Sequence, residues 1–202
     1  MKLNQKIYLF FKRIIDILGS LIGIIFCFVF FWWWVIPVNA IVTKGHPLFM
    51  QERYGKHKKV FKILKFRSMK NNANSYLAPS DITEDVQKNM ETKFGTFLRK
   101  TSIDETPQLL NILFGQMSFI GPRPGAAHNE EELVKLRESY SPNAFEVKQG
   151  LSGLAQLKLK REHSPKLKAK LDSEYVQKVS FWLDFKLFFM TIFSIFNSNK
   201  GK

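Results

Sequence analysis

The sequence is poor in the residues that build disulfides and zinc sites. Its single cysteine, Cys27, lies in an apolar run where a small hydrophobic side chain is unremarkable, so no intrachain disulfide can form. The histidines are isolated from one another and show neither HxH nor HExxH spacing: His46, His57, His128 and His163. Neither GxxxxGK[ST] nor GxGxxG occurs. These absences argue against a zinc enzyme, a standard kinase and a dinucleotide-dependent dehydrogenase.

Acidic residues are scarce as well. Lys and Arg outnumber Asp and Glu by 31 to 17, which gives a net charge of +14, while 45% of the residues are hydrophobic and 20 are Phe. Such a chain should seek both anions and apolar surfaces. Nucleic acid is one candidate anion, but acidic lipid headgroups and phosphorylated substrates fit the Phe excess better. A length of 202 residues suits one compact domain with appendages.

One long stretch almost lacks charge. Ile14 to Val42 carries a single charge, Asp16, and exceeds the roughly 20 apolar residues that cross a bilayer. It is also longer than the apolar core of about 7 to 15 residues in a cleaved signal peptide. Basic residues, which mark cytoplasmic sides, flank it on both ends. We therefore expect a re-entrant helix bent at Pro37, and a straight span with a mild kink is the alternative.

A second apolar stretch runs from Ser180 to Phe196. Its polar residues Asp184, Thr191 and Ser194 fall close to one helical stripe and leave a wide face of Phe, Leu and Trp. This pattern predicts a helix lying in the membrane interface at about residues 180–196, with an ordinary buried core helix as the alternative. The fold class expected is α+β and mainly helical, with an N-terminal re-entrant membrane helix, a small β-hairpin and amphipathic interface helices.

The soluble part begins with PLFMQERYGKHKKVFKILKFRSM, in which two apolar-rich runs flank the polar YGKHKK. This pattern predicts a β-hairpin. Strand alternation places Lys65 and Arg67 on one side, away from Leu64 and Phe66. The two cations belong either to a solvated face or to an anion site, and spacing alone favours the solvated face.

The stretch TSIDETPQLLNILFGQMSFIGPRPG, residues 101–125, contains the adjacent carboxylates Asp104 and Glu105. Their structural interpretation is a capping box, Ser102 with Glu105, that opens a helix closed by Gly115. Pro107 fits a helix start at Asp104 better, because its missing amide would break a helix that began at Ser102. In both registers the carboxylates lie at the positive end of a helix.

The functional interpretation rests on the neighbouring cations. GPRPG presents Arg123 between two rigid prolines, and Arg99 lies shortly before the carboxylates, so the two arginines could grip a diphosphate. The pair Asp104 and Glu105 could bind Mg²⁺ through one oxygen and offer another as a nucleophile toward phosphorus. That chemistry is phosphoryl transfer through an acyl-phosphate.

These residues resemble one known family, the small monotopic bacterial phosphoglycosyl transferases, also called bacterial sugar transferases. The match runs through KRIIDILGSLIG, QERYG, VFKILKFRSM, FGTFLRKTSIDETPQLLNILFGQMSFIGPRP, GLSGLAQ and YVQKVSFWLDFK, which together cover nearly the whole chain. The central block matches over many consecutive positions, so its resemblance to the family is highly specific.

The resemblance implies transfer of a sugar-1-phosphate from a UDP-sugar to undecaprenyl phosphate, with release of UMP and a requirement for Mg²⁺. It makes Asp104 the nucleophile and Glu105 its assistant, with both residues as ligands of the metal. The implied substrate-binding residues are Arg99, Arg123, Lys65, Arg67, Gln156, Lys160 and Arg161. It also favours the anion site over the solvated face for the hairpin cations.

The resemblance further implies residues 1–44 as the membrane-embedded region and 45–202 as a catalytic domain on the cytoplasmic face of the bacterial inner membrane. The expected partners are the UDP-sugar, undecaprenyl phosphate and membrane lipids, with a second copy of the chain as a further candidate and no nucleic acid. The family's Ser-Pro helix break would align near Phe30 and Phe31, where neither residue occurs. A non-enzymatic, membrane-anchored module that binds acidic lipid or nucleic acid is the alternative function.

Overall fold

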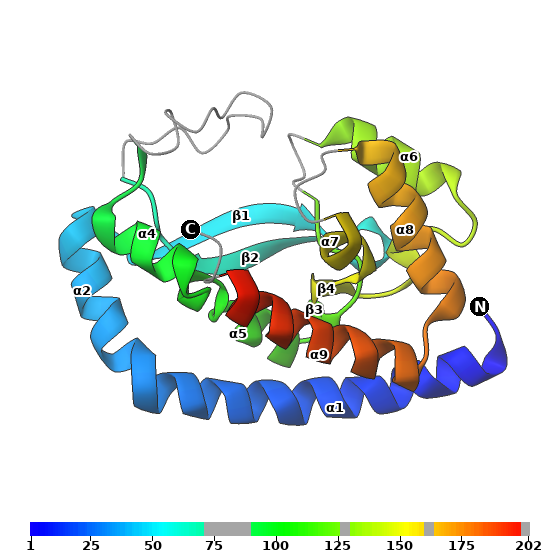
Figure 1. The fold of residues 1–202 in the computed structure, drawn as a ribbon, viewed down its shortest axis with the longest axis horizontal. Coiled ribbons are helices and arrows are strands. Elements are labelled where there is room, and N and C mark those ends of the chain that lie inside the picture. The colour runs from blue at the N-terminus through cyan, green and yellow to red at the C-terminus, as the bar shows by residue number, and fades with distance from the viewer. Residues whose placement is uncertain (71–89, 126–129, 160–163, 199–202) are drawn as a thin grey trace.

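The computed structural model describes residues 1–70, 90–125, 130–159 and 164–198. The described chain is mainly helical. Its helices are α1 Leu3–Cys27, α2 Trp33–Thr43, α4 Lys93–Lys100, α5 Gln108–Leu113, α6 Glu131–Ser139, α7 Leu154–Leu159, α8 Pro165–Lys178 and α9 Phe181–Ser198. Its strands are β1 Leu48–Tyr54, β2 Val60–Phe66, β3 Met117–Ile120 and β4 Gln149–Ser152. Helices and strands form a mixed fold around two small sheets (Figure 1).

The apolar N-terminal segment is one helical stretch, Leu3–Thr43, that is long and apolar enough to cross a membrane by length and composition. Figure 1 shows that α1 runs along one side of the molecule and that the chain then turns into α2. The turn lies at Phe28–Trp32, which is π-helical. A π-turn fits an extra residue into the helix and bends its axis.

The predicted bend at Pro37 is therefore wrong, because Pro37 lies inside α2, beyond the turn. The bend falls where the family's Ser-Pro break aligns, although this chain has Phe30 and Phe31 there. Indole groups satisfy two carbonyls of the π-helical segment. Trp33 Nε1 donates to the Val29 carbonyl at 3.0 Å and Trp34 Nε1 to the Phe30 carbonyl at 2.9 Å.

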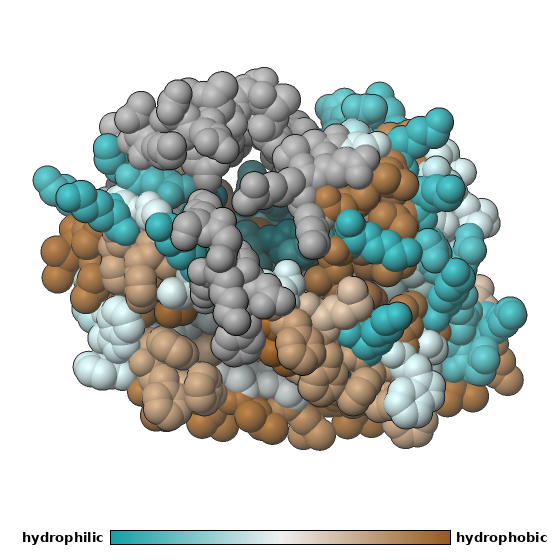
Figure 2. All heavy atoms as spheres, viewed as in Figure 1, coloured by the Kyte–Doolittle hydropathy of each residue, from teal (hydrophilic) through white to brown (hydrophobic). Residues whose placement is uncertain are grey.

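Helix α1 turns its polar residues toward the protein and its apolar residues outward. Lys12, Asp16 and Ser20 are buried, and Asp16 accepts hydrogen bonds from Ser118 Oγ and the Phe119 amide, both at 3.1 Å. The exposed side chains of this helix are nearly all large and hydrophobic. Figure 2 shows the resulting hydrophobic surface along the edge occupied by α1. This reversed pattern is typical of a helix that faces lipid.

Helix α9, like α1, turns a polar residue toward the protein and its apolar residues outward. Asp184 is buried, pairs with Lys12 and accepts from Tyr8 Oη at 2.6 Å and Tyr175 Oη at 2.8 Å. Its outward face is hydrophobic: Phe181, Trp182, Phe185, Phe188, Phe189, Met190 and Phe193. The core-helix alternative for this segment is wrong, because those side chains are exposed. The buried Asp184 instead attaches α9 to α1 and α8.

The predicted hairpin is confirmed. Strands β1 and β2 pair antiparallel, with Leu48 opposite Phe66 and Tyr54 opposite Val60. Phe66 packs edge-on against Trp32 of the π-helical segment, with ring centroids 6.3 Å apart. The end of β2 therefore lies beside the bend of the apolar segment.

The second sheet, the parallel pair β3 and β4, was not predicted from the sequence. Its strands have four residues each, and close approach of their loops requires glycine. A Cβ at Gly150 would lie 2.2 Å from the Gly121 amide nitrogen, and one at Gly153 would lie 2.1 Å from the Gly121 carbonyl oxygen. This packing holds the GPRPG loop against GLSG.

Candidate active site

Asp104 and Glu105 lie in a 3₁₀ turn, Ile103–Glu105, between α4 and α5. The predicted capping box is wrong: Ser102, with φ 57°, makes no side-chain cap in the described chain, and α5 begins only at Gln108. Pro107 explains the interruption, because it has no amide to continue the helical ladder. The carboxylates thus occupy a separate turn and not the first turn of α5. Gly115, with φ 80°, does follow the end of α5, as predicted.

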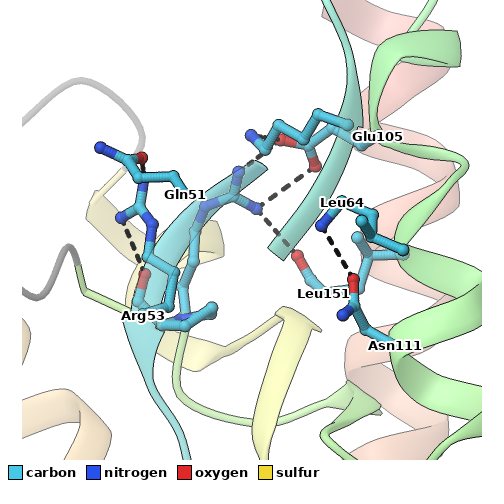
Figure 3. Close-up of polar contacts among 9 residues, drawn as sticks. Gln51, Arg53, Leu64, Glu105, Asn111 and Leu151 are labelled. Atoms are coloured by element: carbon cyan, nitrogen blue, oxygen red, sulfur yellow. Dashed lines mark hydrogen bonds and ion pairs between the residues drawn. The ribbon is translucent and has the colours of Figure 1, made fainter. Parts of the chain in front are cut away.

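Glu105 is held by two cations. Lys65 Nζ donates to Glu105 Oε1 at 2.8 Å, and Arg123 donates to both carboxylate oxygens, through Nη2 to Oε1 and through Nη1 to Oε2 at 3.4 Å. Figure 3 shows these contacts converging on Glu105. Burial opposes ionisation, but the charges of Arg123 and Lys65 outweigh it and lower the pKa of Glu105 to about 2. Glu105 is therefore a permanently ionised structural anion at neutral pH.

Asp104 is in the opposite situation. Asp104 is only 7% exposed. Its carboxylate has no hydrogen bond or ion pair within the described part of the chain. Burial, followed by the negative charge of Glu105, raises the pKa of Asp104 to about 6. Lys65, Arg99 and Arg123 offset part of that rise. At pH 7 the carboxylate is mostly ionised and poorly solvated, which suits a nucleophile.

The GPRPG loop holds Arg123 in place. Arg123 Nη1 donates to the Leu151 carbonyl at 3.0 Å, and Arg137 Nη2 donates to the Arg123 carbonyl at 2.9 Å. Arg137 is itself fully buried and paired with Asp172 of α8. The arginine predicted from the two flanking prolines is therefore fixed by β4, α6 and α8.

The hairpin places one of its two predicted cations in the site. The Lys65 side chain is only 21% exposed and bonds Glu105, so the solvated-face alternative is wrong for Lys65. Arg67 lies elsewhere. Its Nε donates to the His46 carbonyl at 3.1 Å, and its guanidinium lies 6.0 Å from the centre of the Phe49 ring.

The other predicted binding residues are more dispersed. Arg99 on α4 pairs with Glu91 and lies near enough to Asp104 to lower its pKa. Gln156 is exposed on α7, and its side chain makes no hydrogen bond within the described residues. Lys160 and Arg161 lie outside the described residues. The structure therefore groups Lys65, Arg99 and Arg123 around the carboxylates.

Sequence reasoning missed Arg53, on β1. Its Nη1 donates to the Pro124 carbonyl at 3.2 Å and its Nη2 to Gln51 Oε1 at 2.5 Å, as Figure 3 shows. Its Nε is buried and has no partner in the described structure. Burial lowers the pKa of Arg53, and the nearby charge of Arg123 lowers it further. The signal was available in QERYG, where alternation puts Gln51 and Arg53 on one face of the strand.

The donor set at this site bears on whether it could hold Mg²⁺. The described residues contain no group of three or more His, Cys, Asp and Glu that could hold a metal ion. Mg²⁺ needs only one or two carboxylates, because it keeps several waters and binds substrate phosphates. Asp104 fits that requirement, since its buried carboxylate makes no hydrogen bond within the described residues and lies beside the negative charge of Glu105. Both oxygens of Glu105 already accept from cations.

Comparison with known proteins identifies a family. The model of the family described as bacterial sugar transferase matches residues 7–198. The UDP-glucose:undecaprenyl-phosphate glucose-1-phosphate transferase of Klebsiella pneumoniae is 38% identical over 194 residues, which are 92% of this chain and 40% of that protein. The protein of that name from Escherichia coli K12 is 39% identical over 76% of this chain and 33% of its own length.

A shorter relative matches almost end to end. The exopolysaccharide production protein PSS of Rhizobium leguminosarum bv. phaseoli is 33% identical over 94% of this chain and 97% of its own length. The chain thus spans two fifths or less of the length of the two glucose-1-phosphate transferases. It spans nearly all of the shorter protein. From the family match over residues 7–198, the chain belongs to the bacterial sugar transferase family.

Proposed function

We propose that the chain transfers a sugar-1-phosphate from a UDP-sugar to undecaprenyl phosphate and releases UMP. The observation that carries this proposal is the contrast between two adjacent carboxylates. Asp104 is buried and unbonded with a raised pKa, whereas Glu105 is saturated by Lys65 and Arg123. The names of the longer relatives, which specify UDP-glucose and undecaprenyl phosphate, support the substrate classes.

In the first step, an oxygen of the Asp104 carboxylate attacks the phosphorus that carries the sugar. The new oxygen–phosphorus bond forms as the bond from that phosphorus to the bridging oxygen breaks, and UMP leaves with the bonding electrons. Lys65 and Arg123 surround the turn with positive charge, which stabilises a phosphate beside Asp104. Glu105 keeps these two cations in place.

In the second step, a phosphate oxygen of the lipid acceptor attacks the same phosphorus. The Asp104 carboxylate leaves and is regenerated, and the product is an undecaprenyl diphosphate sugar. Asp104 carries the phosphosugar between the two substrates, so neither step requires both to be bound at once. When bound, Mg²⁺ would supply charge neutralisation for the phosphate oxygens, held by Asp104 and near Glu105.

The test compares the wild type with Asp104→Asn on a panel of UDP-sugars, measuring UMP release with undecaprenyl phosphate present. We expect release from at least one sugar by the wild type and none above background by the variant. Turnover by Asp104→Asn would refute the nucleophile assignment. A wild type that releases no UMP, yet binds acidic vesicles with an affinity that falls steeply with salt, would favour the non-enzymatic alternative.

The location is proposed as the cytoplasmic face of the bacterial inner membrane. The outward hydrophobic faces of α1 and α9 would contact membrane lipids, and the turn at Phe28–Trp32 would return the segment to the leaflet it entered. Single cysteines near Lys2 and Lys44 should then be labelled only from the cytoplasm, in a Cys27→Ala background. External labelling at Lys44 would refute the re-entrant arrangement. A second copy of the chain stays a predicted partner, which cross-linking in the membrane would detect.

A further inference from the structure

The bend of the apolar segment contains three consecutive tryptophans whose surroundings differ. Trp33 is 64% exposed, and its indole and that of Trp34 donate to carbonyls of the same helical segment. Trp32 is only 8% exposed. It is the last residue of the π-helical segment and points into the protein instead of outward.

The indole of Trp32 reaches the turn that carries the carboxylates. Its Nε1 donates to Thr106 Oγ1 at 2.9 Å, and the Thr106 hydroxyl donates onward to the Ile103 carbonyl at 2.8 Å. Thr106 directly follows Glu105, and Ile103 directly precedes Asp104. The chain of two hydrogen bonds therefore spans the 3₁₀ turn from one end to the other.

The same indole ring also contacts the other support of the site. It packs edge-on against Phe66, with ring centroids 6.3 Å apart. Phe66 directly follows Lys65, which bonds Glu105. One side chain from the bend thus touches the neighbours of both Glu105 and its lysine partner.

We propose that Trp32 is a positioning residue that fixes the Asp104–Glu105 turn and the Lys65 strand relative to the bend of the apolar segment. This inference rests on the proposed function. Trp32 bonds neither carboxylate, so it acts through Thr106 and Phe66. Its role is to hold the nucleophile at a set place beside the membrane surface.

Such a contact should matter more for turnover than for substrate binding. Attack on phosphorus requires near-attack geometry, and small displacements of a nucleophile reduce rates by up to about a hundredfold. Without the indole N–H, the Thr106 hydroxyl keeps its bond to Ile103 and its contact with Cys27 but loses its hydrogen bond to Trp32. The turn would then be less constrained while Arg123 and Lys65 stay in place to bind phosphate.

The primary experiment compares Trp32→Phe with two matched variants in UMP release. Trp33→Phe removes an indole of the same bend, and Trp182→Phe removes an exposed indole from α9. We expect kcat to fall by roughly ten- to a hundredfold in Trp32→Phe, with KM for the UDP-sugar changed by less than about twofold. Both matched variants should stay within about twofold of the wild type. An equal fall in Trp33→Phe, or a fall expressed in KM alone, would overturn the inference.

A second pair of variants separates positioning from folding. Thr106→Ser keeps the hydroxyl and should keep kcat. Thr106→Val is nearly isosteric but also removes the bond to Ile103, so it should lose at least as much as Trp32→Phe. The double variant Trp32→Phe/Thr106→Val should be no worse than Thr106→Val alone, because the hydroxyl that the indole bonds is already gone. Additive losses would contradict the contact. If the wild type itself shows no UMP release, the proposed function fails, and the role of Trp32 in turnover fails with it. Thermal unfolding of the same variants would then test the Trp32–Thr106 contact separately.

Discussion

Replacing Asp104 with Asn should stabilise the fold while abolishing turnover. The fold buries this carboxylate without a hydrogen bond and beside the negative charge of Glu105. Asn has nearly the same shape and no charge, so it removes an unfavourable interaction. Active sites often store such strain, and a nucleophile that is badly solvated is an example of it.

The magnitude follows from the pKa. The pKa of Asp104 rises from an ordinary 3.8 to about 6 in the folded protein. Each tenfold change in proton affinity is worth about 1.4 kcal/mol, so ionised Asp104 costs the fold about 3 kcal/mol at pH 7. Because the folded pKa is raised, the wild type has its full stability from this group below pH 3.8 and loses it as the pH rises through about 6. Asn mimics the protonated form at every pH.

Glu105→Gln is the matched control, and its expected effect on the stability of the fold has the opposite sign. The pKa of Glu105 falls from 4.5 to about 2, since Arg123 and Lys65 outweigh burial, so ionised Glu105 contributes up to about 3 kcal/mol. That contribution is complete above pH 4.5 and is lost as the pH falls through about 2. Two adjacent carboxyl-to-amide substitutions should therefore change stability in opposite directions at pH 7.

The assay is thermal unfolding in detergent without Mg²⁺, at pH 7 and pH 5. Asp104→Asn should unfold several degrees above the wild type at pH 7, and its advantage should shrink at pH 5. Glu105→Gln should unfold below the wild type by a similar amount at both pH values. Added Mg²⁺ should stabilise the wild type and leave Asp104→Asn unaffected if Asp104 is a metal ligand. Destabilisation by Asp104→Asn at pH 7 would refute the assigned electrostatics.

Three further predictions concern pH and packing. In limiting Mg²⁺, kcat for UMP release should decrease when the pH drops below about 6, because Asp104 becomes protonated. A higher Mg²⁺ concentration should move this decrease to lower pH. A kcat that is constant from pH 8 to 5 would contradict the raised pKa. Arg137→Met should lower the free energy of unfolding in urea by about 3–5 kcal/mol because Asp172 is left buried and unpaired, and Arg137→Met/Asp172→Leu should recover most of it. Gly95→Ala should destabilise by about 1–3 kcal/mol in the same assay, because its Cβ would lie 2.0 Å from the Ser68 carbonyl oxygen.

The local parts of the site were predictable from the sequence. Asp104, Glu105 and Arg123 lie within one 25-residue stretch, residues 101–125, whose length makes a chance match to a known family motif improbable. The alternation of apolar and polar residues predicted the hairpin. The same alternation did not decide whether Lys65 faces solvent or an anion site. The capping box failed because Pro107 splits one expected helix into a 3₁₀ turn and a short α5.

Longer-range features could not be predicted. Strands β3 and β4 have four residues each, too short for a periodic pattern, and they pair in parallel across a distance of about 30 residues. The bend was expected at Pro37, the strongest helix-breaking residue in the segment. It lies instead at Phe28–Trp32, where indole N–H groups satisfy backbone carbonyls and no local signal marks the turn.

The amino-acid sequence by itself determined the long apolar run with one charge and the net charge of +14. These features predict binding to a membrane and to an anion without reference to the fold. The sequence also determined which carboxylates stand side by side. Only the tertiary structure decided that Glu105 has a lowered pKa and Asp104 a raised one, since burial and Coulomb forces act through space. Lys65, 40 residues from Glu105, and Trp32, 74 residues from Thr106, reach the turn only in the folded chain.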